Sequence, residues 1–186
     1  MPFSYKMTRS QAVFWATATA AILLSSSGTA AIAATLSDAQ VLAVYIQVNS
    51  FDIDTALLGR AQGSSDTVRT LADHVASDHL GVRQAAYALG EKCNAHPTLP
   101  AERSSAAVEH DKVLAKLLTL KGPEFDRAYV QHEIAFHRAA IESVKTVLLP
   151  SAQCPALQAH LKAVLPAFEH HLKMTEALLG STGNPQ

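Results

Sequence analysis

Residues 125–147, FDRAYVQHEIAFHRAAIESVKTV, decide the fold that the sequence predicts. At 100° per residue, the apolar side chains of this stretch gather on one broad face, as in a helix that packs into a core. That face carries Tyr129, Val130, Phe136, Ala140, Val144 and Val147. Glu133 and His137 fall near its middle, one helical turn apart. Because an unpaired polar group in a core costs a few kcal/mol, both side chains need partners from other helices.

The same periodicity predicts three more long helices and one short helix. The long helices are expected at residues 38–61 and 67–92 and from Ser151–Pro155 to Leu179, with the quoted helix running from Pro123 to about Leu149. The short helix is expected at residues 102–120, packing through Val108, Leu114, Leu117 and Leu118. No run of residues shows the alternation typical of a strand, so the predicted class is all-α.

Each of the other long helices also places a polar residue on or beside its apolar face. Asp52 lies on the face of the first helix, His79 on that of the second, and His171 flanks that of the last. Asp78 lies at the edge of the second helix's face, placed to orient or neutralise a neighbouring side chain. His74 lies well off that face, and we expect it to be solvated.

The path of the short helix decides whether these residues meet. It either folds back at one end of an up-down-up-down bundle or crosses the bundle lengthwise, as in ferritin-like folds with up-down-down-up topology. About 17 helical residues span roughly 25 Å, enough for the crossover. Only the crossover brings Cys93 and Cys154 to the same end, where they could form a disulfide. It also places all the inward polar residues about 19 to 25 Å from that end.

The sequence therefore predicts one layer of acids and imidazoles inside a ferritin-like four-helix bundle. Its members are Asp52, His79, Glu133, His137 and His171, with Asp78 behind them. Three imidazoles and two carboxylates suit one divalent ion such as Zn²⁺, Fe²⁺, Mn²⁺ or Cu²⁺. The alternative is a hydrogen-bonded network that only fixes the register of the helices. Periodicity leaves both interpretations open.

The N-terminus has the pattern of a secretory signal peptide. Lys6 and Arg9 precede an apolar run at residues 12–24, and Ala31-Ile32-Ala33 fits the cleavage pattern. The run is too short for a spanning helix, although an N-terminal anchor is the alternative. The expected organisation is a cleaved signal at 1–34, a helical domain at 35–180 without a membrane span, and a disordered tail at 181–186. The mature protein is then periplasmic or secreted.

Composition limits the possible partners. The chain has 15 Lys and Arg against 16 Asp and Glu, a net charge of −1, which gives no attraction to nucleic acid. All nine histidines follow residue 34, and histidine is the commonest metal ligand in proteins. Two cysteines, Cys93 and Cys154, favour a disulfide in a chain that enters an oxidising compartment.

Several motifs resemble the DUF4142 family over roughly residues 40–179. They are Leu58-Gly59-Arg60-Ala61, Val68-Arg69, Ala72-Asp73-His74, Ser77-Asp78-His79, the run Gly122 to Val130 (GPEFDRAYV), His137, Leu165-Pro166 and His171-Leu172. The resemblance implies an exported bacterial protein with a ferritin-like bundle and no established activity. Phe136 stands where that family usually has an Asp before its His, and Asp52 stands where it commonly has a Glu.

No catalytic motif supports an enzyme. A nucleophile elbow, a Cys-x-x-Cys pair and a Gly-rich phosphate loop are all absent from the sequence. Ferritin-like di-iron sites need a Glu three residues before a His on each of two helices. Ala76 stands three residues before His79 and Phe168 three residues before His171, so the sequence does not support a di-iron site. The first hypothesis is a non-enzymatic module of the cell envelope or stress response with an unknown protein partner. The second is a mononuclear metal-binding protein.

Overall fold

Capping residues set where the helices begin. The Ser37 hydroxyl accepts a hydrogen bond from the Gln40 amide, and the Gln40 side chain accepts one from the Ser37 amide, which completes a capping box. Ser65 caps the next helix by accepting from the Val68 amide. Pro123 occupies the first turn of the helix that holds Glu133 and His137. Local chemistry thus fixes the starts of three helices.

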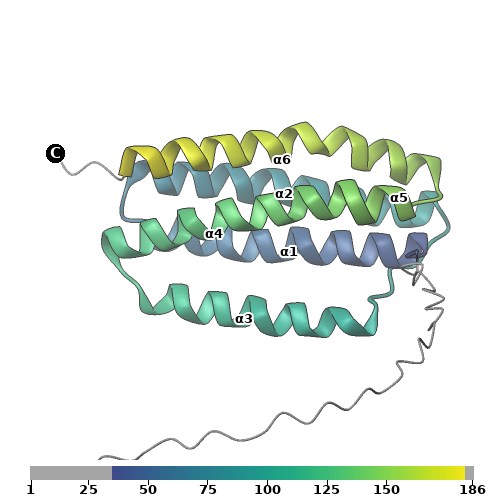
Figure 1. The fold of residues 1–186 in the computed structure, drawn as a ribbon, viewed down its shortest axis with the longest axis horizontal. Helices are drawn as coiled ribbons and strands as arrows, with labels where there is room; N and C mark the ends of the chain where they lie inside the picture. Colours follow the sequence, from purple (N-terminus) through teal and green to yellow (C-terminus); the bar gives the residue numbers. More distant parts are fainter. Residues whose placement is uncertain (1–34, 183–186) are drawn as a thin grey trace, which may run out of the picture. The chain divides into compact units, whose positions relative to one another are not determined.

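The computed structural model describes residues 35–182, and the side chains of residues 35–180. Its helices are α1 (Asp38–Gln62), α2 (Asp66–Lys92), α3 (Ser104–Thr119), α4 (Gly122–Ser143), α5 (Leu149–Ser151) and α6 (Pro155–Thr182), with a 3-10 turn at Ala101–Arg103 and a π-helical turn at Val144–Leu148 (Figure 1). The described part contains no strand, so the all-α prediction is confirmed. The predicted signal segment and the last four residues of the predicted tail lie outside the described residues.

One disulfide and two hydrogen bonds join helix ends that are distant in the sequence. Cys93, after α2, and Cys154, before α6, form a disulfide with their Cα atoms 5.9 Å apart, which confirms that prediction. Asp38 in the first turn of α1 accepts hydrogen bonds from the amides of Gln153 and Cys154 at 2.7 and 3.0 Å. The start of α1, the end of α2 and the start of α6 therefore lie together.

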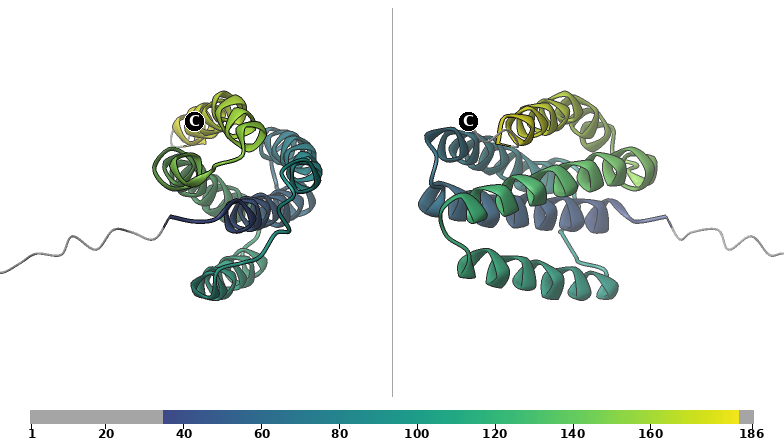
Figure 2. Two further views of the ribbon diagram at one scale, coloured as in Figure 1. Left: turned by 90° about the vertical axis from the view of Figure 1, so that its right-hand side faces the viewer. Right: turned by 60° about the vertical axis from the view of Figure 1, so that its left-hand side comes forward.

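Asp126, near the start of α4, makes the corresponding contacts at the opposite ends of α1 and α2. Its carboxylate accepts hydrogen bonds from the amides of Ser64 and Ser65, in the connection between α1 and α2. Helix α3 thus leads from the end that holds the disulfide to the end that holds Asp126. The left view of Figure 2, nearly along the helices, shows α3 outside the long helices α1, α2, α4 and α6, near α1 and α4.

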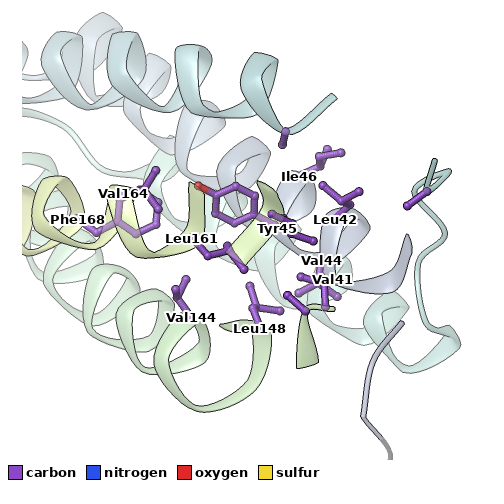
Figure 3. Packing of buried hydrophobic residues seen from close by; sticks show 14 of the residues in the cluster. Val41, Leu42, Val44, Tyr45, Ile46, Val144, Leu148, Leu161, Val164 and Phe168 are labelled. Atoms are coloured by element: carbon purple, nitrogen blue, oxygen red, sulfur yellow. The ribbon is translucent and has the colours of Figure 1, made fainter. Parts of the chain in front are cut away.

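The core consists of two apolar clusters. Figure 3 shows the first, in which Tyr45 and Leu42 of α1 pack with Leu148, Leu161 and Phe168. The second contains Val68, Leu71 and Val75 of α2 and Phe125, Tyr129, Val130 and Ile134 of α4. Along α1, α2 and α4, buried polar residues separate the members of one cluster from those of the other. The polar residues thus occupy a layer between the two clusters.

Helix α1 is long and apolar enough to cross a membrane by length and composition alone, with a mean hydropathy of 1.3 over its best window. Its buried residues include apolar side chains of the first cluster, and they also include the polar Asn49 and Asp52. Core helices of folded domains commonly combine these properties, so the apolar character of α1 is explained by its place in the core.

Two predicted packing faces differ from the structure. Val147 is exposed and Leu148 is buried, because the π-helical turn adds a residue to the turn and shifts the apolar face by one position. In α3, Val108 and Leu118 are exposed and Leu117 is buried. Because α3 lies outside the four long helices, it buries only a narrow face, and some of its apolar side chains stay exposed.

Replacing Gly59 with Ala should destabilise the protein. A Cβ at this buried position of α1 would lie 2.7 Å from Cζ of the fully buried Tyr129 and 3.0 Å from Cβ of Ala72. Such overpacking costs about 1–3 kcal/mol, more than the better helix propensity of Ala returns. We expect the free energy of unfolding in urea to fall by about 1–2 kcal/mol.

Gly81→Ala in α2 is the matched control for that substitution. Gly81 is exposed, and a Cβ there meets no atom within 4 Å, so only helix propensity changes. This variant should be more stable by about 0.5–1 kcal/mol. Equal effects of the two substitutions would contradict the close α1–α4 packing at Gly59.

Candidate metal centre

The polar layer contains the five residues that the sequence nominates as ligands. Asp52 comes from α1, His79 from α2, Glu133 and His137 from α4, and His171 from α6. None of the five is more than 1% exposed. The ring centroid of His171 lies 5.4 Å from that of His79 and 5.4 Å from that of His137, and the centroids of His79 and His137 are 5.6 Å apart. The structure therefore brings all five residues together.

Each imidazole uses one ring nitrogen to bind a protein acceptor behind it. His79 Nδ1 lies 2.9 Å from the Asn49 side-chain oxygen, and His137 Nδ1 lies 3.0 Å from the Glu133 backbone carbonyl. His171 Nε2 lies 3.0 Å from the Asp78 carboxylate. A carbonyl oxygen can only accept a hydrogen bond, as can a carboxylate, so these three nitrogens carry protons. A neutral imidazole then has a lone pair on its other nitrogen.

The amide of Asn49 is held in this orientation by its own hydrogen bond. Its nitrogen donates to the Tyr45 carbonyl at 2.8 Å, which leaves the oxygen facing His79. This fixes Nδ1 of His79 as the protonated nitrogen.

The other nitrogens of the three imidazoles have no hydrogen-bond partner within the described part of the chain. They are Nε2 of His79, Nε2 of His137 and Nδ1 of His171. His79 Nε2 lies 2.9 Å and His137 Nε2 lies 3.5 Å from Asp52 Oδ2, but neither contact has hydrogen-bond geometry. One potential ligand atom from each of the three histidines lies within 4.8 Å of the others.

The two carboxyl groups differ in protonation. Burial alone would raise the pKa of Asp52, but the neighbouring His79 and His137 and a hydrogen bond with Glu133 lower it to about 2. Burial, and then the charge of Asp52, raise the pKa of Glu133 well above its ordinary value. The layer therefore holds one carboxylate, Asp52, beside one neutral acid, Glu133, to which Thr55 donates at 3.2 Å.

Burial favours neutral imidazoles here. It lowers the pKa of His137, against the opposing effect of Asp52. It lowers the pKa of His171 to about 4, against the opposing hydrogen bond to Asp78. At neutral pH both rings are unprotonated on one nitrogen, which is the form that binds a metal ion.

The metal-free protein should become less stable as the pH falls from about 6.5 to 4. An unfolded histidine takes up its proton near pH 6.5, whereas burial lowers the pKa of His132 and His171 to about 4 in the folded protein. The pKa of His137 is lowered in the same way. The raised pKa of Glu133 acts in the opposite direction, because the folded protein holds one proton there that the unfolded chain releases. The unfolded chain therefore binds more protons in this window, and acidification favours it.

Urea unfolding of EDTA-treated protein at pH 7, 6 and 5 measures this effect. Each net proton lowers the free energy of unfolding by about 1.4 kcal/mol per pH unit. An unfolding midpoint that stays constant from pH 7 to 5 would contradict the neutral state of the buried imidazoles.

Some residues of the site were not predicted. Asn49 and Thr55 are fully buried three residues before and after Asp52, a spacing that places all three on one face of α1. This spacing could have indicated that Asn49 and Thr55 lie inside the bundle. It was not decisive, because neutral polar residues also occur on helix surfaces. His74, predicted to be solvated, is exposed, but its Nε2 lies 3.9 Å from the carboxylate of Asp78.

Other histidines make their contacts outside the layer. His160 Nε2 lies 3.2 Å from the Tyr45 hydroxyl. His110 of α3 stacks on Phe51 with ring centroids 4.2 Å apart, and its Nε2 lies 3.4 Å from Asp54 Oδ2. These contacts account for histidines that periodicity alone could not separate from the ligand candidates.

Comparisons with known proteins agree with the fold. The family model "Domain of unknown function (DUF4142)" matches residues 24–178. The crystal structure of a DUF305 fragment from Deinococcus radiodurans aligns with a TM-score of 0.68 at 18% identity, covering 77% of this chain and 95% of that one. A DUF305 protein from Streptomyces coelicolor, described as a candidate secreted protein, aligns with a TM-score of 0.67 at 15% identity, covering 80% and 95%. At these identities the structures show a shared fold alone. No curated protein matches the chain.

Proposed function

The chain belongs to the DUF4142 family, a domain of unknown function, and from this premise we propose that its polar layer binds one divalent transition-metal ion. The ligands are His79 Nε2, His137 Nε2, His171 Nδ1 and the carboxylate of Asp52. One observation carries the proposal: the outer nitrogen of each imidazole is held by a protein acceptor, while the inner nitrogen has no partner. Metal-binding histidines are oriented in this way, by an acceptor on the nitrogen away from the ion.

Electrostatics supports a cation in the layer. The buried Asp52 carboxylate has only imidazoles and the neutral acid Glu133 beside it, and no Lys or Arg pairs with it among the described residues. Burying a charge without a permanent cation beside it is costly. A network that served only to fix helix register would gain stability by pairing these same atoms. A dication among them supplies the missing positive charge and uses the lone pairs that hydrogen bonding leaves free.

The donor set favours Zn²⁺, Fe²⁺, Mn²⁺ or Cu²⁺. Three imidazole nitrogens and a carboxylate oxygen are ligands that these ions accept. Zinc–nitrogen bonds of about 2.0–2.1 Å place tetrahedral ligands roughly 3.4 Å apart, so the side chains would close slightly around the ion. Glu133 lies beside this set, because one ligand atom from each of Asp52, Glu133 and His137 lies within 4.8 Å of the other two. A bound dication lowers the pKa of a nearby acid, so Glu133 would supply a carboxylate oxygen as a fifth ligand on losing its proton.

The proposed architecture and location suit this role. The end-to-end contacts of α1, α2, α4 and α6 support an up-down-down-up, ferritin-like bundle in which α3 is the crossover. The disulfide and the signal-like N-terminus support export to the periplasm or outside the cell. The layer is sealed from solvent, which suits holding an ion in the cell envelope rather than turning over a substrate.

Metal titration of the exported, EDTA-treated protein tests the proposal. We expect one equivalent of Zn²⁺ or Co²⁺ per chain at neutral pH, measured by elemental analysis after dialysis. At a free ion concentration 100 times Kd, binding adds about 2.7 kcal/mol to stability and raises Tm by several degrees. A folded protein that takes up no ion with excess Zn²⁺, Cu²⁺, Fe²⁺ or Mn²⁺, and whose Tm does not change, would show that the layer is a structural network.

A further inference from the structure

A second group of ligand atoms lies directly outside the layer, on the surface of α2 and α6. Asp78 Oδ2 is 3.0 Å from His171 Nε2 and 3.9 Å from His74 Nε2. One ligand atom from each of these residues lies within 4.8 Å of the other two. The side chains of His74 and Asp78 are 57% and 45% exposed, whereas that of His171 is 1% exposed. We call His74, Asp78 and His171 the outer cluster.

We infer that the outer cluster is a surface cation site through which the metal ion reaches the buried layer. This inference rests on the proposed function, because it assumes an ion inside. His171 belongs to both sets of ligands: its Nε2 faces Asp78, and its Nδ1 is the unpartnered nitrogen of the layer. An ion on the Nε2 side is therefore one imidazole ring away from the inner position.

The ring of His171 can serve both positions without changing its charge. An ion on Nε2 displaces the proton of that nitrogen to Asp78 or to water in the groove, and Nδ1 takes up a proton from water. When the ion is on Nδ1 both transfers reverse: Nδ1 releases its proton, and Nε2 regains one and its bond to Asp78. The ion moves from one side of the ring to the other, and the neutral ring keeps one proton throughout. Asp78 supplies negative charge at the outer position, where the ion still has water on its exposed side.

The surface around the outer cluster gives solvent access. An open groove of about 560 Å³ is lined by residues of α2 and α6, including His74 and Met174. His74 is the member of the outer cluster that lines this groove, so the groove leads to the imidazole of His74, and Asp78 and His171 lie beyond it. The five residues of the layer are each at most 1% exposed, so an ion needs an intermediate position at which it can lose water in steps.

Metal uptake by the His74→Ala variant tests the inference. His74 is exposed and contacts no residue of the inner set except His171, with ring centroids 6.1 Å apart, so the substitution should preserve folding. We expect the rates of Co²⁺ uptake and release by EDTA-treated protein, measured by stopped-flow absorbance, to fall together by about tenfold. The Kd of the inner ion should stay unchanged. The ion enters and leaves by the same path, so its uptake and release rates change by the same factor.

His170→Ala is the matched control, since His170 is an exposed histidine next to His171. Its uptake and release rates should equal those of the unmodified protein. If the unmodified protein binds one ion and His74→Ala takes it up at the same rate, the outer cluster is not on the path, although the proposed function stands. If the unmodified protein binds no ion, the proposed function fails and this inference fails with it.

Discussion

Replacing His137 with Ala is expected to abolish stoichiometric metal binding. His137 is fully buried, its Nε2 is one of the three unpartnered imidazole nitrogens, and it lies 3.5 Å from the Asp52 carboxylate. Losing a residue that only orients a ligand already weakens metal binding by about 10–100-fold, and losing a ligand should exceed that. We expect Kd for Zn²⁺ to rise more than 100-fold in competition with a chromophoric chelator. His79→Ala should have the same effect.

Two controls separate loss of a ligand from loss of the fold. His170→Ala removes an exposed imidazole from the same protein and should leave Kd unchanged. Circular dichroism of metal-free His137→Ala and His79→Ala should show cooperative melting, although a cavity in the core lowers Tm. A cooperatively folded His137→Ala protein that still bound one ion with unchanged affinity would remove His137 from the site.

Removing the disulfide should have the largest effect on stability. Cys93 and Cys154 are 61 residues apart in the sequence, and the bond joins the end of α2 to the start of α6. In the chain-entropy account, closing a loop of this length in the unfolded chain stabilises the folded protein by about 4 kcal/mol. The Cys93→Ser/Cys154→Ser double variant should lose about that much free energy of unfolding in urea.

The unmodified protein under reducing conditions serves as the matched comparison. It should lose a similar amount of stability, because the covalent link is broken without changing either side chain. A thiol assay on unreduced, exported protein should find no free cysteine, consistent with the bond between Cys93 and Cys154. If the double variant and the reduced unmodified protein each lost less than 1 kcal/mol of free energy of unfolding, a stabilising role for this bond would be contradicted.

The all-α class and the positions of the helices along the chain were largely predictable because several sequence signals agreed. The apolar periodicity of residues 125–147 and the cap at Ser37 predicted helices close to those observed, α4 and α1. The apolar periodicity of residues 102–120 predicted a helix close to α3, and the two cysteines of a chain expected to be exported predicted the bond between Cys93 and Cys154. Each argument concerns a feature that one helix or one bond sets by itself.

Details that depend on how helices rotate against one another were not predictable. The π-helical turn at Val144–Leu148 moves the buried face from Val147 to Leu148, and nothing in its local sequence specifies that extra residue. The partner of His79 is Asn49 on a different helix, which only the packing of α1 against α2 decides. Periodicity places a side chain on a face but does not say which ring nitrogen points inward.

That last detail gives the layer its chemical meaning. The sequence predicts five polar residues at one level, and this is compatible with a metal ion or a hydrogen-bonded network. The structure adds the acceptors Asn49, the Glu133 carbonyl and Asp78, which leave three inner nitrogens without partners beside the Asp52 carboxylate. Metal binding by this layer is therefore the central claim.

Anomalous diffraction from crystals grown with one equivalent of Zn²⁺ tests that claim most directly. Data collected on both sides of the zinc absorption edge should show a single strong peak inside the helices. The peak should lie about 2.0–2.2 Å from His79 Nε2, His137 Nε2, His171 Nδ1 and an oxygen of Asp52. A layer without a zinc peak, in which these atoms bond to one another or to water, would contradict it.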